Sequence, residues 1–192
     1  VLPPLLSRFT EQYPQVQVNL VEATTSQLTD RLFSGSLDLL IDNKSMDPAI
    51  YQKSFFCEEH LLLAVPIRLS VNEKMKNYAL TASDIRENRH LNSRIPPVPL
   101  ENFQEESFLL LKSGNDTRTR ADRICHNAHV IPKIKLELDQ QITAYNLSRY
   151  GMGISFCSDT LVRHVPDAGG LVYYKLNHQD APRDVNFSYK RN

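Results

Sequence analysis

Hydroxyl side chains stand near the start of the chain, where an extended pattern gives way to a helical one. Thr24, Thr25 and Ser26 occupy this junction. The first turn of a helix offers free N–H groups and a partial positive charge, which together suit a small anion. Plain capping of the helix by a hydroxyl is the alternative interpretation.

A second loop of this kind lies further along the chain. Ser113, Gly114, Asn115 and Asp116 separate an apolar run from a helical pattern. Gly114 would let the backbone approach a ligand closely, and Arg118 carries the forked donor that binds carboxylates. A turn with Asp116 as N-cap and Arg118 on a solvated or interface surface would account for the same residues.

A third helix start is predicted at Asp139, Gln140 and Gln141. These polar groups can also face a ligand, although Asp139 as a simple N-cap explains the position as well. A carboxylate here disfavours a dianionic ligand, or favours one that carries an amine.

Other motifs give no convincing metal site or catalytic group. Cys125 and His129 are four residues apart on a predicted helix, which can ligate zinc, but Cys125 belongs to the apolar stripe and a structural role is favoured. The stretch "GISFC" lacks the second glycine of a nucleophile elbow, and "GMG" follows a helix, the reverse of a dinucleotide loop. We therefore expect no enzymatic activity, no cofactor and no metal ion.

The composition excludes some classes of protein. The 192 residues include 22 Lys and Arg against 22 Asp and Glu, so the formal net charge is zero. Chains that bind nucleic acid usually carry a basic excess, so any DNA contact is expected from another segment. Three cysteines cannot all pair, which predicts a reducing compartment, the cytoplasm. No apolar run reaches the length of a membrane span.

Alternating helix and strand patterns predict an α/β fold. An amphipathic helix over 2–13 has an apolar face made of Leu2, Leu5, Leu6, Phe9 and Tyr13. A strand over 16–20, a helix ending near Gly35 and a strand over 37–41 read as a βαβ unit with a parallel sheet.

The later part repeats this alternation after an irregular stretch. Residues 67–104 are polar with weak periodicity, which indicates an insertion or a linker into a second domain. Strands are expected at 60–66, 107–111, 134–138, 153–157, 171–176 and 185–190, and helices at 117–128 and 140–150. Two α/β halves predict two lobes, with a ligand held beyond the carboxyl ends of the strands.

Several of these stretches resemble the effector-binding domain of LysR-type transcriptional regulators. They are "LPPLLSRFTEQYPQVQVNLVEATTSQL", "GSLDLLI", "SFLLLKSGNDTRTRADRICHNA" and "RYGMGISF". The resemblance implies two Rossmann-like lobes of the type 2 periplasmic-binding-protein fold, formed by 1–65 plus 169–192 and by 66–168. A small effector would lie in a central cleft lined by Thr24, Thr25, Ser26, Ser113, Gly114, Asn115, Arg118, Asp139 and Gln140.

The resemblance also implies partners. Regulators of this family act on DNA through an N-terminal winged helix-turn-helix domain, which we expect outside this chain, and form homodimers that become tetramers at full length. The dimer would pair helix 2–13 with helix 117–128 of a second copy through Leu2, Leu5, Leu6, Phe9, Ala121, Ile124 and Cys125. Relative to the family, a first strand and a C-terminal helix are missing and 72–96 looks inserted. A solute-binding protein outside the cytoplasm is the alternative.

Overall fold

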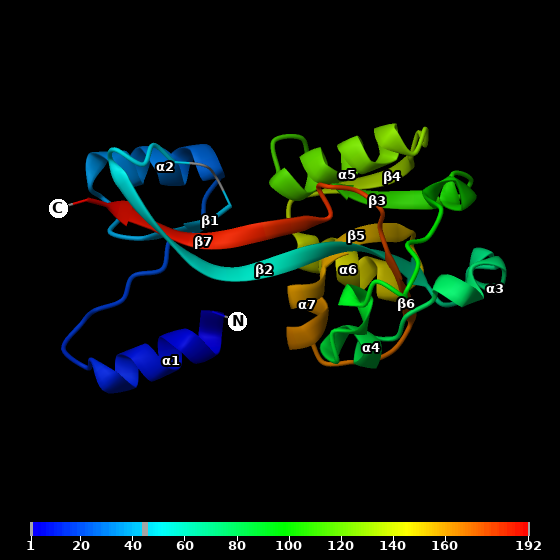
Figure 1. Cartoon of the computed structure of the whole chain (residues 1–192), viewed down its shortest axis with the longest axis horizontal. Helices are drawn as coiled ribbons and strands as arrows, with labels where there is room; N and C mark the ends of the chain where they lie inside the picture. Colours follow the sequence, from blue (N-terminus) through cyan, green and yellow to red (C-terminus); the bar gives the residue numbers. More distant parts are fainter. Residues whose placement is uncertain (1, 44–45, 192) are drawn as a thin grey trace. The chain divides into compact units, whose positions relative to one another are not determined.

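The computed structural model describes residues 2–43 and 46–191, which form two compact units (Figure 1). Unit 1 comprises Val1–Glu58 and Asp184–Asn192, and unit 2 comprises Glu59–Arg183. The boundaries between the two units therefore differ from the lobe boundaries expected at 65/66 and 168/169. Residues 59–66 and 169–183 stay with unit 2 because a strand over 171–175 pairs with residues 62–66.

The elements are, in chain order, α1 (Leu2–Gln12), α2 (Thr25–Ser34), β1 (Leu40–Asp42), β2 (Tyr51–Pro66), α3 (Val71–Lys74), η1 (Lys76–Tyr78), α4 (Ala82–Arg86), η2 (Arg89–Leu91), η3 (Leu100–Phe103), β3 (Ser107–Leu111), α5 (Asp116–Asn127), β4 (Lys133–Leu138), α6 (Gln141–Arg149), β5 (Ile154–Ser158), α7 (Asp159–His164), β6 (Leu171–Lys175) and β7 (Pro182–Lys190). None of the helices in the described residues has the length and apolar character that crossing a bilayer requires.

Unit 1 is built on a small sheet in which β7 lies between β1 and the first part of β2. Its core consists of Leu32, Leu40 and Tyr51. Helix α2 begins and ends as predicted: Thr24 forms a capping box with Gln27, and Gly35 ends the helix with a φ of 79°.

Two predictions for unit 1 are wrong. Residues 16–20 form no strand, and Val16, Val18 and Leu20 are exposed, because nothing in the described part of the chain pairs with them. The strand over 37–41 is only the three-residue β1, which pairs with β7 in the antiparallel direction. The predicted βαβ unit with a parallel sheet therefore does not form.

Helix α1 keeps its apolar face uncovered within the chain. No residue of this helix is buried, and Leu5 and Phe9 are 41% and 38% exposed. Such a face at helical spacing is typical of a surface that packs against another helix.

Unit 2 is a sheet with the strand order β6-β2-β5-β3-β4. Strands β5, β3 and β4 are parallel to one another, whereas β2 is antiparallel to both β5 and β6. Figure 1 shows α5 over one face of this sheet, with α4, α6 and α7 over the other. The buried side chains agree, since one core cluster joins α5 to the sheet and another joins α4, α6 and α7 to it.

The packing of α5 corrects one expectation. Ala121, Ile124 and Cys125 are 2%, 3% and 2% exposed, and they lie in the core cluster against β2, β3 and β5. These three side chains cannot form a dimer surface, because their helix face is already covered by the sheet of its own chain.

Residues 67–104 are an integral part of unit 2. Their short helices contribute Ile85 and Phe103, both fully buried, to the two cores. Backbone hydrogen bonds tie this segment to β6, from Val98 N to Lys175 O and in both directions between Leu80 and Tyr173. The linker interpretation is therefore wrong, and the segment extends the core.

We expect Ile85→Ala to lower the free energy of unfolding by roughly 2–5 kcal/mol, because the truncation leaves a cavity in a closed core. Leu91→Ala in the same segment is the matched control: Leu91 is 46% exposed, so we expect a change of about 0.5 kcal/mol or less. Urea denaturation followed by circular dichroism measures both. Equal effects of the two substitutions would contradict the packing described here.

Candidate functional site

Unit 1 contributes the start of α2. The Thr24 Oγ1 accepts a hydrogen bond from Gln27 N at 3.4 Å, and Thr24 N donates to Gln27 Oε1 at 3.2 Å. The capping interpretation therefore holds for Thr24. Thr25 and Ser26 occupy the exposed first turn, where backbone N–H groups have no partner within the helix.

Unit 2 contributes the loop between β3 and α5. Gly114 has a φ of 89°, and a Cβ built on it would meet nothing within 4 Å, so the backbone there is open to a ligand. Asn115, rather than Asp116, is the N-cap: its Oδ1 accepts from Thr117 N at 2.9 Å. Ser113 is exposed beside it.

The loop between β4 and α6 lies next to this one. Lys112 N donates to Leu138 O at 2.9 Å, and Lys112 Nζ pairs with the exposed carboxylate of Asp139, also at 2.9 Å. Helix α6 begins at Gln141 with Gln140, not Asp139, as its N-cap. The structure thus brings the predicted residues of the two loops together, because β3 and β4 are parallel neighbours whose carboxyl ends meet.

Arg118 is placed differently from the prediction. Its Nε donates to Asp122 at 2.9 Å, and its Nη1 donates to Leu111 O at 2.8 Å and to Glu137. The hydrogen bond to Glu137 raises the pKa of Arg118 above its ordinary value. The guanidinium is therefore occupied by its own unit, which argues against a role in holding an effector carboxylate.

A polar network that the sequence did not indicate joins the starts of α5, α6 and α7. Gln141 Nε2 donates to Thr117 Oγ1 at 3.4 Å, and Gln141 Oε1 accepts from Ser158 Oγ at 3.1 Å. Thr160 Oγ1 donates to Ser158 Oγ at 2.9 Å or to Glu59 Oε2 at 3.0 Å. We call these five residues, from Thr117 to Glu59, the helix-start network.

Two arginines and two carboxylates complete this region. Arg183 Nε donates to Glu59 Oε1 at 2.6 Å, and Arg183 also pairs with Asp116. Arg120 is buried, donates to the carbonyl oxygen of Ala181 at 2.6 Å, and lies 3.5 Å from Glu59 Oε1. Burial, with the nearby Arg183 charge, lowers the pKa of Arg120.

Most residues of this region, which comprises the helix-start network and its arginine and carboxylate partners, follow no sequence pattern that predicts their contacts. Gln141 could be found, since it lies in a predicted first turn, but Glu59 and Arg183 come from strands and are 124 residues apart. The pairing of β2 with β5 explains the contact of Glu59 with Thr160. Leu61 pairs with Ser158, the last residue of β5, and α7 begins at the next residue, which brings its first turn beside Glu59.

The chemistry of this region is that of binding. Burial raises the pKa of the Cys125 thiol to about 12 and raises that of Cys157 further, so neither supplies a thiolate near neutral pH. The exposed groups at the carboxyl ends of β3 and β4 are backbone N–H groups, a hydroxyl, amides and the ion pair of Lys112 with Asp139. These groups can donate and accept hydrogen bonds and can pair with a charged ligand.

We expect Glu59→Gln to lower the free energy of unfolding by roughly 3–5 kcal/mol at neutral pH, because Arg120 and Arg183 would then share the single carboxylate of Asp116. Glu105→Gln is the control, since it breaks the exposed pair with Lys133 and should cost about 1 kcal/mol or less. Denaturant titrations of both variants test this, and a small effect at Glu59 would contradict the proposed charge balance.

Comparison with known proteins identifies relatives along the whole chain. The family model described as the LysR substrate binding domain matches residues 1–192. The HTH-type transcriptional regulator YcgK of Bacillus subtilis is 28% identical over 193 aligned residues, covering 100% of this chain and 57% of that protein. CbbR of Rhodospirillum rubrum is 26% identical, covering 95% of this chain and 53% of that protein. The chain thus spans about half the length of these relatives.

Solved structures share the fold. The regulatory domain of Synechocystis PCC6803 CcmR in complex with 2-PG matches with a TM-score of 0.76 at 18% identity, covering 99% of this chain and 81% of that one. The BenM effector-binding domain with its effector benzoate matches with a TM-score of 0.69 at 22% identity, covering 100% and 78%. With the family model spanning every residue, the chain belongs to the LysR substrate-binding domain family.

Proposed function

We propose that this chain is the effector-sensing domain of a bacterial LysR-type transcriptional regulator. The family match over residues 1–192 carries this proposal. The paired loops of unit 2 support it, because they present helix starts and amide groups at the carboxyl ends of parallel strands. In open α/β sheets this edge is the usual place for a ligand.

The proposed effector is a small carboxylate. Within unit 2, the helix start at Asp116 offers backbone N–H groups, and Ser113 and Asn115 lie beside it. BenM, one structural relative, has benzoate as its effector. The exposed carboxylate of Asp139 is balanced by Lys112 at 2.9 Å, and this ion pair could contact a carboxylate or an amine of the ligand.

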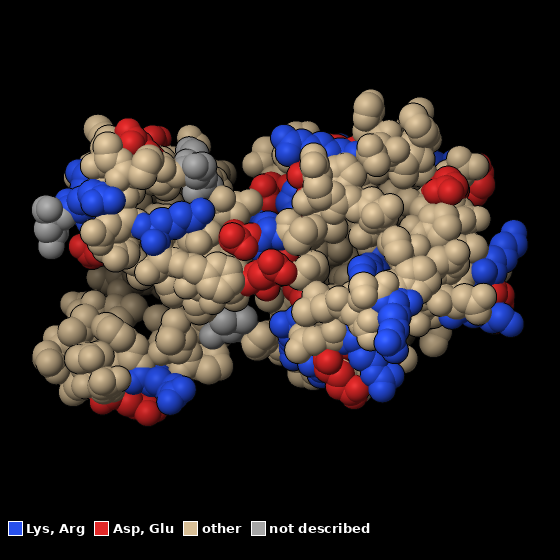
Figure 2. Space-filling model, in the orientation of Figure 1, with Lys and Arg blue, Asp and Glu red and all other residues tan. Residues whose placement is uncertain are grey.

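The proposed readout is a change in DNA binding by a region of the protein outside this chain. The zero net charge supports this assignment, and Figure 2 shows acidic and basic side chains interspersed on the visible face. The effector would act by binding one of two arrangements of the regulator more tightly than the other. We place this regulator in the cytoplasm and assign it no catalytic role. The matched relatives are transcriptional regulators, so the transporter alternative gains no support.

We expect a monocarboxylate from a screen of carboxylic and amino acids, with benzoate included as a probe, to raise the melting temperature of the chain by mass action. Ser113→Asp should weaken that binding at least tenfold, because a second negative charge would face the ligand. Isothermal titration calorimetry gives the two affinities.

Ser93→Asp is the matched control, since it adds the same charge to an exposed position of unit 2 far along the chain from either loop. It should leave the affinity unchanged. If the parent chain, Ser113→Asp and Ser93→Asp had equal affinities, the ligand would bind elsewhere. If none of the acids in the screen raised the melting temperature, the proposed effector class would be wrong.

The apolar face of α1 supports a homodimer. We expect Leu5→Glu to shift the chain from dimer to monomer in analytical ultracentrifugation, because it puts a charge in the centre of that face. Ser7→Glu adds the same charge to the opposite side of the helix and should leave the dimer intact. The α5 partner surface would consist of outward side chains such as Asp122 and His126, since Ala121, Ile124 and Cys125 are buried. A dimer that survives Leu5→Glu would exclude α1 from the interface.

A further inference from the structure

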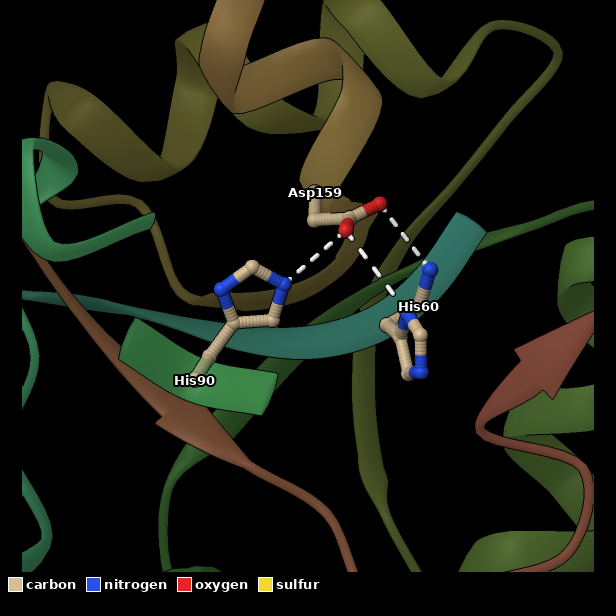
Figure 3. A group of neighbouring side chains, drawn as sticks. All are labelled: His60, His90 and Asp159. Carbon is tan, nitrogen blue, oxygen red and sulfur yellow. Dashed lines mark hydrogen bonds and ion pairs between the residues drawn. The ribbon is translucent and has the colours of Figure 1, made fainter. Parts of the chain in front are cut away.

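A histidine–histidine–aspartate cluster lies in unit 2, apart from the helix-start network. His60 comes from β2, His90 from η2 and Asp159 from the first position of α7, and the three side chains converge (Figure 3). Their ligand atoms all lie within 4.8 Å of one another. Among the described residues this is the one group of three or more His, Cys, Asp or Glu side chains with that spacing.

The distances within the cluster match those of a metal centre. In a tetrahedral zinc site with nitrogen and oxygen ligands about 2.1 Å from the ion, neighbouring ligand atoms are about 3.4 Å apart. The distance from His90 Nε2 to Asp159 Oδ2 is 2.9 Å, and that from His60 Nδ1 to the same oxygen is 3.7 Å. All three ligand atoms lie within 4.8 Å of one another, so rotation of the side chains would bring them around one ion.

The ligands are already oriented by the fold. His60 N donates to Asp159 Oδ1 at 2.9 Å, which fixes the carboxylate and turns Oδ2 toward the two imidazoles. Asp159 and His90 are buried, and the Nδ1 of His90 has no hydrogen-bond partner in the described part of the chain. Nε2 of this ring therefore faces Asp159, and binding of an ion there would require the ring proton to sit on Nδ1.

Arg163 is the group that competes with an ion. Its Nη2 donates to Asp159 Oδ2 at 2.7 Å, and that is its one hydrogen bond within the described residues. The side chain of Arg163 is 27% exposed, so the guanidinium can swing into water while Asp159 keeps its remaining partners.

We propose that His60, His90 and Asp159 form a binding site for a divalent transition-metal ion of the zinc class. Two imidazoles and a carboxylate are ligands that zinc accepts, and three protein ligands leave a fourth position for water. The ion would replace the hydrogen bond between His90 and Asp159 and join η2, β2 and α7, which lie far apart in the sequence. The site shares no residue with the two loops proposed to face the effector, since its ligands come from β2, η2 and α7.

The test uses the full chain freed of metal by a chelator and titrated with zinc chloride. We expect one equivalent to bind and to raise the melting temperature. His90→Ala should weaken this binding at least a hundredfold. Arg163→Ala should tighten it severalfold, a gain that a purely structural hydrogen-bonded cluster would not give. His126→Ala removes an exposed histidine of α5 and should leave the affinity within twofold of the parent value.

A measurement on the unmodified chain tests the site even if the variants do not fold. Zinc should shift the ring resonances of His60 and His90 in NMR spectra while leaving those of exposed His164 in place. Cobalt(II) should give the intense visible bands of a tetrahedral site. Absence of stoichiometric binding, unchanged affinity in folded His90→Ala, or shifts confined to other histidines would overturn the proposal.

Discussion

The inner half of β2 has to be buried on both faces, and the rest of unit 2 depends on this constraint. Successive side chains of a strand point to opposite faces, so Leu61, Leu63 and Val65 enter one core while Leu62 and Ala64 enter the other. Helix α5 covers the first set, and α4, α6 and α7 cover the second. Pairing with β5 on one side and β6 on the other satisfies the backbone of the same residues.

The same alternation positions the polar groups that precede this apolar run. The side chain of Glu59 points to the same face of β2 as Leu61 and lies near Arg120 of α5. The side chain of His60 points to the same face as Leu62 and lies beside Asp159 and His90. A charged network and a histidine cluster thus arise from two adjacent residues of one strand.

The sequence predicted the elements whose signals are local. Helices α1, α2, α5 and α6 follow from apolar spacing, and the N-cap Thr24 and the C-cap Gly35 follow from residue type. Strands β3 and β5 follow from short apolar runs. Val16, Val18 and Leu20 alternate with polar residues as in a strand. No strand in the described part of the chain pairs with them, so no ladder of backbone hydrogen bonds forms. Residues 67–104 were misjudged because Val71, Ile85 and Phe103 lie in helices of five residues or fewer, too short to show a period.

The candidate site was predictable to a smaller extent. Ser113, Gly114 and Asn115 are residue types typical of a turn that precedes a helix, so the sequence predicts this loop. Its position next to the loop after β4 follows because β3 and β4 are parallel neighbours. Arg118 was misplaced because its partner Glu137 lies on another strand, and ion pairs between strands depend on register. Glu59, His90 and Asp159 were missed for the same reason, since each acquires its partners only through tertiary packing.

The first turn of α7 forms hydrogen bonds with two successive residues of β2. Thr160 holds the Glu59 carboxylate, and the Asp159 carboxylate holds the backbone N–H of His60. One planar peptide group connects Glu59 to His60, so these two contacts are fixed to the same short piece of β2. One turn of α7 therefore anchors both faces of β2 at the point where its apolar run begins.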